Sequence, residues 1–176
     1  VMHWWHPPSD RGIRTRITDN LIWLPYVTAQ YIQATGDHAI LDEQIPFLSA
    51  EPLKDGEHER YGEFLAGTTE TLYEHCRRAL SKGTTIGTHG LPLMGEGDWN
   101  DGMNKVGAGG DGESVWLGWF LYSTLTSFAE VCKEEQASEY RQQAEALHAA
   151  LETSAWAGNW YRRAYYDDGK PLGSIE

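Results

Sequence analysis

Apolar side chains recur along the chain mainly at the three- and four-residue spacing of helices. The first such stretch predicts a helix that begins after Thr18 or Asp19, which are both good N-caps, and ends at Gly36. Pro25 lies within the first two turns of this helix, where a proline costs less than in the middle. Asp37 then opens a shorter helix that runs to about residue 44.

Three further patterns predict the longer helices in the rest of the chain. The first begins at Thr68 or Thr69 and ends before Gly83. The others cover residues 115–133, behind a Ser114 cap, and residues 137–155. The middle helix is apolar almost all round, so we expect it to be deeply buried. Residues 3–18 and 45–66 predict irregular segments, and residues 160–169 predict a short strand and turn.

Helices joined by long loops, with almost no strand signal, predict an all-α fold of helical hairpins. About five helices in this arrangement fit part of a toroid. The longest apolar run, roughly residues 115–125, is too short to cross a membrane, so no membrane contact is expected within the segment.

The longest predicted loop, residues 83–113, holds ten of the nineteen glycines. A loop of this length in a compact domain is usually functional. Near its centre Glu96, Asp98 and Asp101 accompany Trp99 and Asn100. A tryptophan beside carboxylates is typical of a sugar site, which needs a flat apolar face together with acids and acceptors. The alternative is an acidic turn in which Trp99 anchors the core.

Three other motifs do not fit the sequence around them. Residues 107–112 match G-x-G-x-x-G, but no strand precedes them, so a flexible loop that leads into the Ser114 cap is favoured over a nucleotide cofactor site. His3 and His6 stand three residues apart without a third ligand, and residues 98–109 depart from the calcium-loop pattern. We therefore expect no metal and no cofactor.

Composition narrows the classes of partner. A net charge of −12 argues against non-specific binding to nucleic acid, which needs clustered cations. Eight tryptophans and nine tyrosines suit either a large aromatic core or a carbohydrate cleft. Cys76 and Cys132 belong to no paired motif and are interpreted as free thiols in a reducing compartment.

The basic residues Arg11, Arg14 and Arg16 form a cluster in an otherwise acidic chain. Their guanidinium groups could bind sugar hydroxyls, carboxylates or phosphate. The alternative is a solvated turn that neutralises nearby acids. Asp19 follows closely and could act either with the arginines or only as a helix cap.

Five blocks, in order along nearly the whole chain, resemble glycoside hydrolase family 94. This family comprises inverting disaccharide phosphorylases and the phosphorylase-like part of cyclic β-1,2-glucan synthases. The blocks are His-Trp-Trp-His-Pro at 3–7, Arg-Gly-Ile-Arg-Thr-Arg at 11–16 with Asp19, Gly-Asp-Trp-Asn-Asp-Gly at 97–102, Gly-Glu-Ser-Val-Trp at 112–116, and Trp-Tyr-Arg-Arg-Ala-Tyr at 160–165. The third block is the most specific, and residues 14–26 look most like the glucan synthase branch.

The resemblance implies a fold, a reaction and a location. The fold would be an (α/α)6 barrel, of which residues 1–176 would be a single partial catalytic domain truncated at both ends. The reaction would be inverting phosphorolysis, or glycan-chain trimming, of β-linked glucosides, with phosphate as co-substrate and no further cofactor. The location would be cytoplasmic, including the cytoplasmic part of an inner-membrane synthase. The exposed inner faces of a partial toroid would favour self-association.

The resemblance also implies roles for individual residues. Asp101 would be the general acid, and Trp99 would line the subsite of the sugar that is cleaved. The other residues assigned to the substrate are Arg11, Arg16, Asp19, Asp98, Asn100 and Glu113. Of these, Asp98 is assigned to sugar binding or to bracing of the loop, and Glu113 to a similar supporting part. The phosphate-binding residues are expected beyond the end of this chain.

The physical logic separates three functional alternatives. A glycosidic oxygen leaves poorly unless an acid protonates it. An inverting hydrolase also needs a second carboxylate, about 6.5–9.5 Å from the first, as the base for water, whereas a phosphorylase uses phosphate itself as the nucleophile. The alternatives to a phosphorylase are therefore an inverting hydrolase on the same barrel and a non-catalytic carbohydrate-binding segment of a larger synthase.

Overall fold

The computed structural model describes residues 2–173, with only the backbone of Asp101 included. Its long helices are α1 (Asp19–Thr35), α2 (Leu72–Gly83), α3 (Val115–Val131) and α4 (Glu134–Ala150). Short helical turns are η1 (Pro7–Ser9), η2 (His38–Asp42), η3 (Asp101–Met103) and the π-turn η4 (Leu151–Ala155). The strands are β1 (Trp4–His6), β2 (Arg11–Thr15), β3 (Gln44–Ser49), β4 (Glu59–Glu63), β5 (Leu65–Thr71), β6 (Glu113–Ser114), β7 (Ala164–Tyr165) and β8 (Pro171–Leu172).

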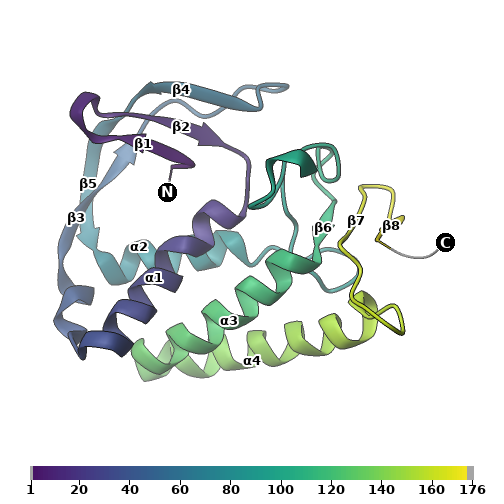
Figure 1. Cartoon of the computed structure of the whole chain (residues 1–176). Coiled ribbons are helices and arrows are strands. Elements are labelled where there is room, and N and C mark those ends of the chain that lie inside the picture. The colour runs from purple at the N-terminus through teal and green to yellow at the C-terminus, as the bar shows by residue number, and fades with distance from the viewer. Residues whose placement is uncertain (1, 174–176) are drawn as a thin grey trace.

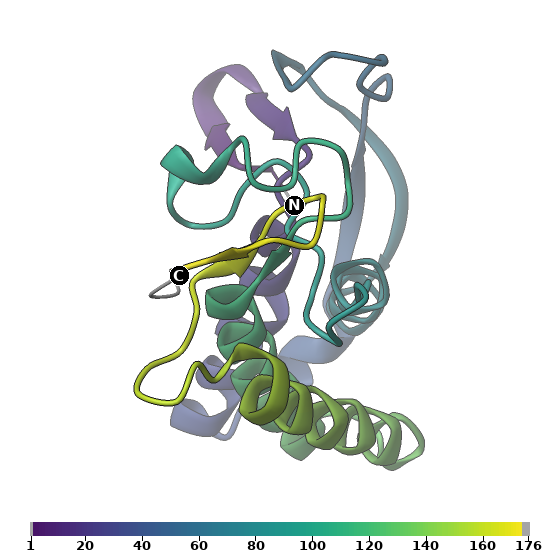
Figure 2. The same ribbon diagram turned by 90° about the vertical axis from the view of Figure 1, so that its right-hand side faces the viewer.

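The long helices form a layer beneath strands β1, β2 and β4, and strands β3 and β5 rise along one side of this layer (Figure 1). Helix α3 packs against both α1 and α4, and α1 also packs against α2. The glycine-rich loop after α2 and the short sheet β6-β7-β8 lie together at one end of the helices (Figure 2). This end of the molecule carries the sequence block predicted to be functional.

The core is built around α3, as its apolar sequence predicts. Leu117, Leu121 and Phe128 are each fully buried. The Ser114 hydroxyl accepts a hydrogen bond from the Leu117 amide at 3.0 Å and so caps the helix. In the part of the chain that the structure describes, no helix is long and apolar enough to span a bilayer.

The predicted helices are confirmed, with shifted ends. Helix α1 ends before Gly36, whose φ of 73° gives a left-handed C-cap. Helix α2 begins at Leu72 instead of residue 68 or 69, because strand β5 occupies the preceding residues and Thr71 provides the cap by accepting a hydrogen bond from the Glu74 amide. The predicted strand and turn at 160–169 correspond to β7 and the turn before β8.

The all-α prediction is not confirmed, because residues predicted to be irregular form antiparallel strands. Strand β2 pairs with β1 and β4, and β3 pairs with β5. Most side chains of β3, β4 and β5 are exposed or half-buried. These strands therefore do not need the alternation of apolar and polar residues by which a half-buried strand is recognised. The chain is a mixed α and β structure, with its long helices where the sequence places them.

Candidate active site

The acidic loop packs directly against the segment that leads into α1. The Thr18 amide donates to the Met94 carbonyl at 3.1 Å, and Ile17 forms a bridge with Gly95. Gly95 has a φ of 64°, and a Cβ at this position would collide with the Arg16 carbonyl oxygen. Glycine is therefore required for this close approach, which brings the motif at 97–102 to the start of α1.

A cavity of about 380 Å³ lies where the loop meets α1. Its lining residues are Met2, His3, Asp19, Asn20, Trp23 and Trp99. A volume in this range suits a small ligand. Trp99 is 62% exposed, so it is not the core anchor of the alternative interpretation but an available aromatic face beside the cavity.

Aromatic side chains continue from Trp99 across the helices. The ring of Trp99 lies 6.0 Å from that of Trp116, which lies 5.4 Å from Phe120. The ring centre of Phe120 in turn lies 4.5 Å from that of Trp23, which is the second tryptophan that lines the cavity. The two tryptophans of the cavity are thus joined by a continuous aromatic support, of the kind that holds a flat surface for a sugar ring.

Asp19 is buried at the first residue of α1, with only 3% of its surface exposed. Thr18 occupies the N-cap position, so the interpretation of Asp19 as only the cap does not hold. The Trp23 indole nitrogen donates to the Asp19 carboxylate at 3.3 Å. Burial raises the pKa of Asp19 above its usual value, and this hydrogen bond partly opposes the shift.

This raised pKa predicts a pH-dependent contribution to stability. In the folded protein Asp19 binds its proton more tightly than in the unfolded chain, where the pKa of an aspartate is about 3.9. The free energy of unfolding should therefore fall as the pH rises from about 3.9 through the folded pKa of Asp19. Asp19→Asn should remove this loss. We expect the difference in free energy of unfolding between variant and parent, measured in urea at several pH values, to grow in favour of the variant across this window. A difference that does not change with pH would contradict the assignment.

Asp98 is buried, and protein groups bind both of its carboxylate oxygens. Ser114 Oγ donates to Oδ2 at 2.6 Å, and Arg163 Nη2 donates to Oδ1 at 2.6 Å. The Asn100 amide also donates to Oδ1, at 3.1 Å. Of the two roles predicted for Asp98, this geometry corresponds to bracing of the loop. Nothing in its sequence neighbourhood indicates Arg163 as the partner.

Asn100 and Asp101 follow at the start of the short helix η3. The Asn100 side chain caps this helix by accepting a hydrogen bond from the Gly102 amide at 3.0 Å. Asp101 is the first residue of η3, and its side chain lies outside the described part of the structure. The backbone on either side of Asp101 is thus fixed by Asn100.

Glu113 is 1% exposed and braces the other half of the glycine-rich loop. Its carboxylate accepts hydrogen bonds from the amides of His89 and Leu91 at 3.0 and 3.1 Å, and lies 2.5 Å from His89 Nδ1. The His89 ring stacks on Tyr165, with ring centres 3.7 Å apart. The predicted supporting part of Glu113 therefore has a concrete form, in which one carboxylate holds the turn at 87–91.

Arg11 and Arg16 lie on the strand side and do not line the cavity of Asp19 and Trp99. Arg11 forms an ion pair with Glu63 of the neighbouring strand at 2.6 Å. Arg16 donates to the carbonyls of Lys54 and Glu57 at 2.8 and 3.2 Å. The structure therefore brings Asp19 and Trp99 together but leaves the two arginines on neighbouring strand and loop segments.

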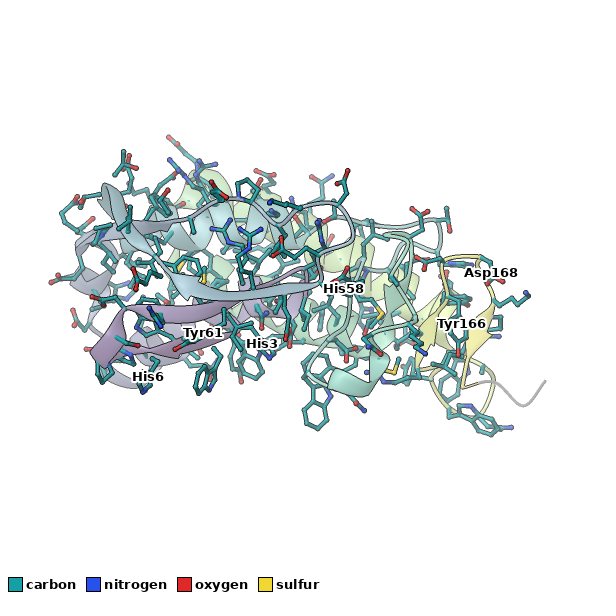
Figure 3. The ribbon with its side chains drawn as sticks, turned by 90° about the horizontal axis from the view of Figure 1, so that it is seen from above. His3, His6, His58, Tyr61, Tyr166 and Asp168 are labelled. Atoms are coloured by element: carbon teal, nitrogen blue, oxygen red, sulfur yellow. The ribbon has the colours of Figure 1, made fainter. Side chains whose placement is uncertain are left out.

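His3, just before strand β1, and His6, at the end of that strand, also lie apart from one another. His3 approaches Asn20 at 3.2 Å beside the cavity, whereas His6 contacts Ser9 at 2.9 Å. In Figure 3 the two histidines are labelled at separate points along the strands, and His3 lies on the side toward His58. Among the side chains that the structure describes, which leave out that of Asp101, no group of three or more His, Cys, Asp or Glu is arranged to hold a metal ion.

The G-x-G-x-x-G segment at 107–112 binds a carboxylate of the protein itself. The amides of Gly109, Asp111 and Gly112 donate to Asp167 at 2.8, 2.9 and 3.0 Å. Main-chain amides of one short segment that converge in this way form an anion-binding nest. The segment is not a free loop but is attached to the turn before β8, and the sequence gives no indication of this partner.

Comparison with known proteins finds one family across the chain. The family model described as "Glycosyl hydrolase 94 superfamily, catalytic domain" matches residues 1–176. Cyclic beta-(1,2)-glucan synthase NdvB from Rhizobium meliloti is 45% identical over 182 residues, covering 100% of this chain and 6% of that protein.

Phosphorylases are also among the relatives. Solabiose phosphorylase from Paenibacillus borealis is 35% identical, over 89% of this chain and 19% of that protein. N,N'-diacetylchitobiose phosphorylase from Vibrio furnissii is 27% identical, over 96% of this chain and 20% of that protein. The chain therefore spans one fifth or less of the length of these relatives.

Proposed function

The chain belongs to the glycosyl hydrolase 94 superfamily, and from this we propose that it carries the acid-bearing part of a phosphorylase-type active site. The substrates are β-linked glucosides, either disaccharides or glucan chains. The observation that carries the proposal is the cavity lined by Asp19, Trp23 and Trp99, of which Trp99 stands two residues before Asp101 in the chain. The relatives named as phosphorylases support the reaction type.

In the proposed reaction Asp101 donates its proton to the glycosidic oxygen. The bond from the anomeric carbon to that oxygen breaks, and the leaving sugar departs with a free hydroxyl. A phosphate oxygen attacks the same carbon from the opposite face, so the products are the released sugar and a sugar phosphate of inverted configuration. Asp101 regains its proton from solvent or from the incoming acid phosphate.

The cavity residues bind the sugar that is cleaved. Trp99 and Trp23 provide apolar surface for the ring, and the Asp19 carboxylate accepts hydrogen bonds from its hydroxyls. Asn100 acts through the backbone that it shares with Asp101. We also assign Arg11, on strand β2, and Arg16, in the segment just after it, to the edge of the substrate path beyond this cavity.

We also infer that α1–α4 belong to a helical barrel, as the family resemblance implies. Helix α1 carries Trp23, Val27 and Tyr31 at four-residue spacing, and these side chains are 42%, 51% and 44% exposed. Apolar residues at this spacing form one face of a helix. An exposed face of this kind is expected where further helices of the same barrel would cover it.

An inverting hydrolase is the second candidate, and one observation favours it. Asp19 lines the same cavity, and its raised pKa suits a general base that activates water. Asp98 is a poorer candidate for that base, because its carboxylate is already bound by Arg163 and Ser114. The two candidates differ in whether phosphate or water attacks the anomeric carbon.

The products distinguish the two reactions. The protein that contains residues 1–176, with any sequence that flanks them, is incubated with β-1,2-linked and other β-linked glucosides, with and without inorganic phosphate. We expect α-configured glucose 1-phosphate to form only when phosphate is present, as followed by NMR of the anomeric proton. Free glucose released at the same rate without phosphate would support the hydrolase and overturn the phosphorylase proposal.

A further inference from the structure

We propose that Arg163 is a positioning residue for the proton donor and that it acts through Asp98. This inference rests on the proposed function of Asp101. Arg163 lies next to strand β7 and is 65 residues away from Asp98 in the sequence. Its guanidinium nevertheless forms an ion pair with the Asp98 carboxylate at 2.6 Å.

The ion pair is enclosed by the protein. The Asp98 side chain has no exposed surface, and the Arg163 side chain is only 28% exposed. A buried carboxylate is strongly unfavourable unless a cation and hydrogen-bond donors accompany it. Asp98 therefore depends on Arg163 for its place under the loop.

The guanidinium joins two separate segments at once. While Nη2 binds Asp98, Nη1 donates to Ser114 Oγ at 3.2 Å, and that hydroxyl donates to the other oxygen of Asp98. The result is a closed ring of hydrogen bonds among three side chains. A planar fork with two donors is needed to close it, and lysine cannot supply this geometry.

The ring continues into the backbone around Asp101. Asp98 Oδ1 accepts from the Asn100 amide at 3.1 Å, and the Asn100 side chain accepts from the Gly102 amide at 3.0 Å. The residues on both sides of Asp101 are therefore tied to the ion pair. A proton donor must lie within hydrogen-bond reach of the leaving oxygen, and a displacement of about 1 Å is enough to cost about a hundredfold in rate.

The backbone of Arg163 is itself held firmly. Its amide donates to the Leu172 carbonyl at 2.8 Å, and its carbonyl accepts from the Val115 amide at 3.2 Å. These bonds anchor Arg163 to β8 and to the start of α3. The guanidinium thus extends from a fixed frame to the acidic loop, which is the geometry that a positioning residue requires.

The experiment compares two substrates that differ in their need for a proton. The leaving oxygen of a β-linked disaccharide needs protonation. The dinitrophenolate of a dinitrophenyl β-glucoside departs without it. In the whole protein that contains this chain, Arg163→Met should lower phosphorolysis of the disaccharide about a hundredfold and affect the aryl glucoside far less. Arg163→Lys keeps the charge and should recover part of the lost rate on the disaccharide. It replaces the methionine variant in the experiment if that variant does not fold.

Arg162 provides the matched control. Its guanidinium donates to the carbonyls of Ser154 and Trp156, away from the acidic loop. Arg162→Met should therefore lower the rates on both substrates by equal factors, or leave both unchanged. Equal factors for both substrates in the Arg163 variants would mean that Arg163 only stabilises the fold, and would overturn the inference.

Asp101→Asn separates this inference from the proposed function. If this variant retains activity on the aryl glucoside but loses activity on the disaccharide, the acid role of Asp101 holds. The Arg163 variants then test positioning alone. If Asp101→Asn lowers both rates equally, the proposed proton donor fails, and the inference about Arg163 fails with it.

Discussion

Replacing Asp101 by asparagine is expected to lower the turnover of a β-linked disaccharide by about 10²–10⁴-fold. Asparagine has a similar size but no proton to give to the glycosidic oxygen, so the leaving sugar would depart as an alkoxide. Binding should change little, because Trp99 and Asp19 still line the cavity. The measurements are kcat from the release of sugar phosphate and the affinity for the disaccharide by calorimetry.

Asp111 supplies the control for this substitution. It is an exposed aspartate in the same glycine-rich segment, and its backbone amide, not its side chain, makes the bond to Asp167. Asp111→Asn should leave both kcat and affinity unchanged. If Asp101→Asn retained turnover while affinity fell, Asp101 would bind sugar instead of donating a proton, and the chain would be a carbohydrate-binding segment.

Replacing Glu113 by alanine is expected to destabilise the turn at 87–91 by about 1–3 kcal/mol. The substitution removes the acceptor of the His89 and Leu91 amides and of the His89 ring. Buried donors that lose their acceptor carry the full cost of leaving water. Hydrogen exchange of these two amides in the intact protein gives the free energy of local opening, and this value should fall.

A surface glutamate serves as the control for Glu113. Glu145 is exposed on α4, and Glu145→Ala should change the free energy of unfolding by no more than about 0.5 kcal/mol. Glu113→Gln should lie between the two, because its amide oxygen still accepts one of the bonds. Unchanged exchange at His89 and Leu91 in the alanine variant would show that the carboxylate does not hold this turn.

The sequence predicts the helices well because their signals are local. The Ser114 cap, the apolar run after it and the terminal Gly36 each act within a few residues, and the structure confirms all of them. The sequence does not predict strands β3 to β5, for the opposite reason. Their side chains are largely exposed and their pairing is with distant segments, so they leave no alternating pattern in the sequence.

The site shows the same division between local and distant information. The motif at 97–102 indicates Trp99 and Asp101 from a few adjacent residues. The partners of Asp98 and Glu113 come from elsewhere, Arg163 in one case and His89 in the other. A sequence alone gives no means of matching a buried acid with a cation 65 positions away. Asp98 and Glu113 can therefore be assigned to the site from the sequence, but the side chains that bind them cannot be identified from it.

The nest around Asp167 determines which substitutions the glycine-rich segment can accept. Because main-chain amides make the contacts, the side chain at position 111 is free to vary, whereas a Cβ at Gly112 would collide with Gly107 and with the Val106 carbonyl. At position 167, asparagine would present only one acceptor oxygen to three amides, and glutamate would be one methylene too long. Among homologous proteins, the segment can therefore diverge widely in its side chains provided that these two glycines and the distant aspartate are inherited together.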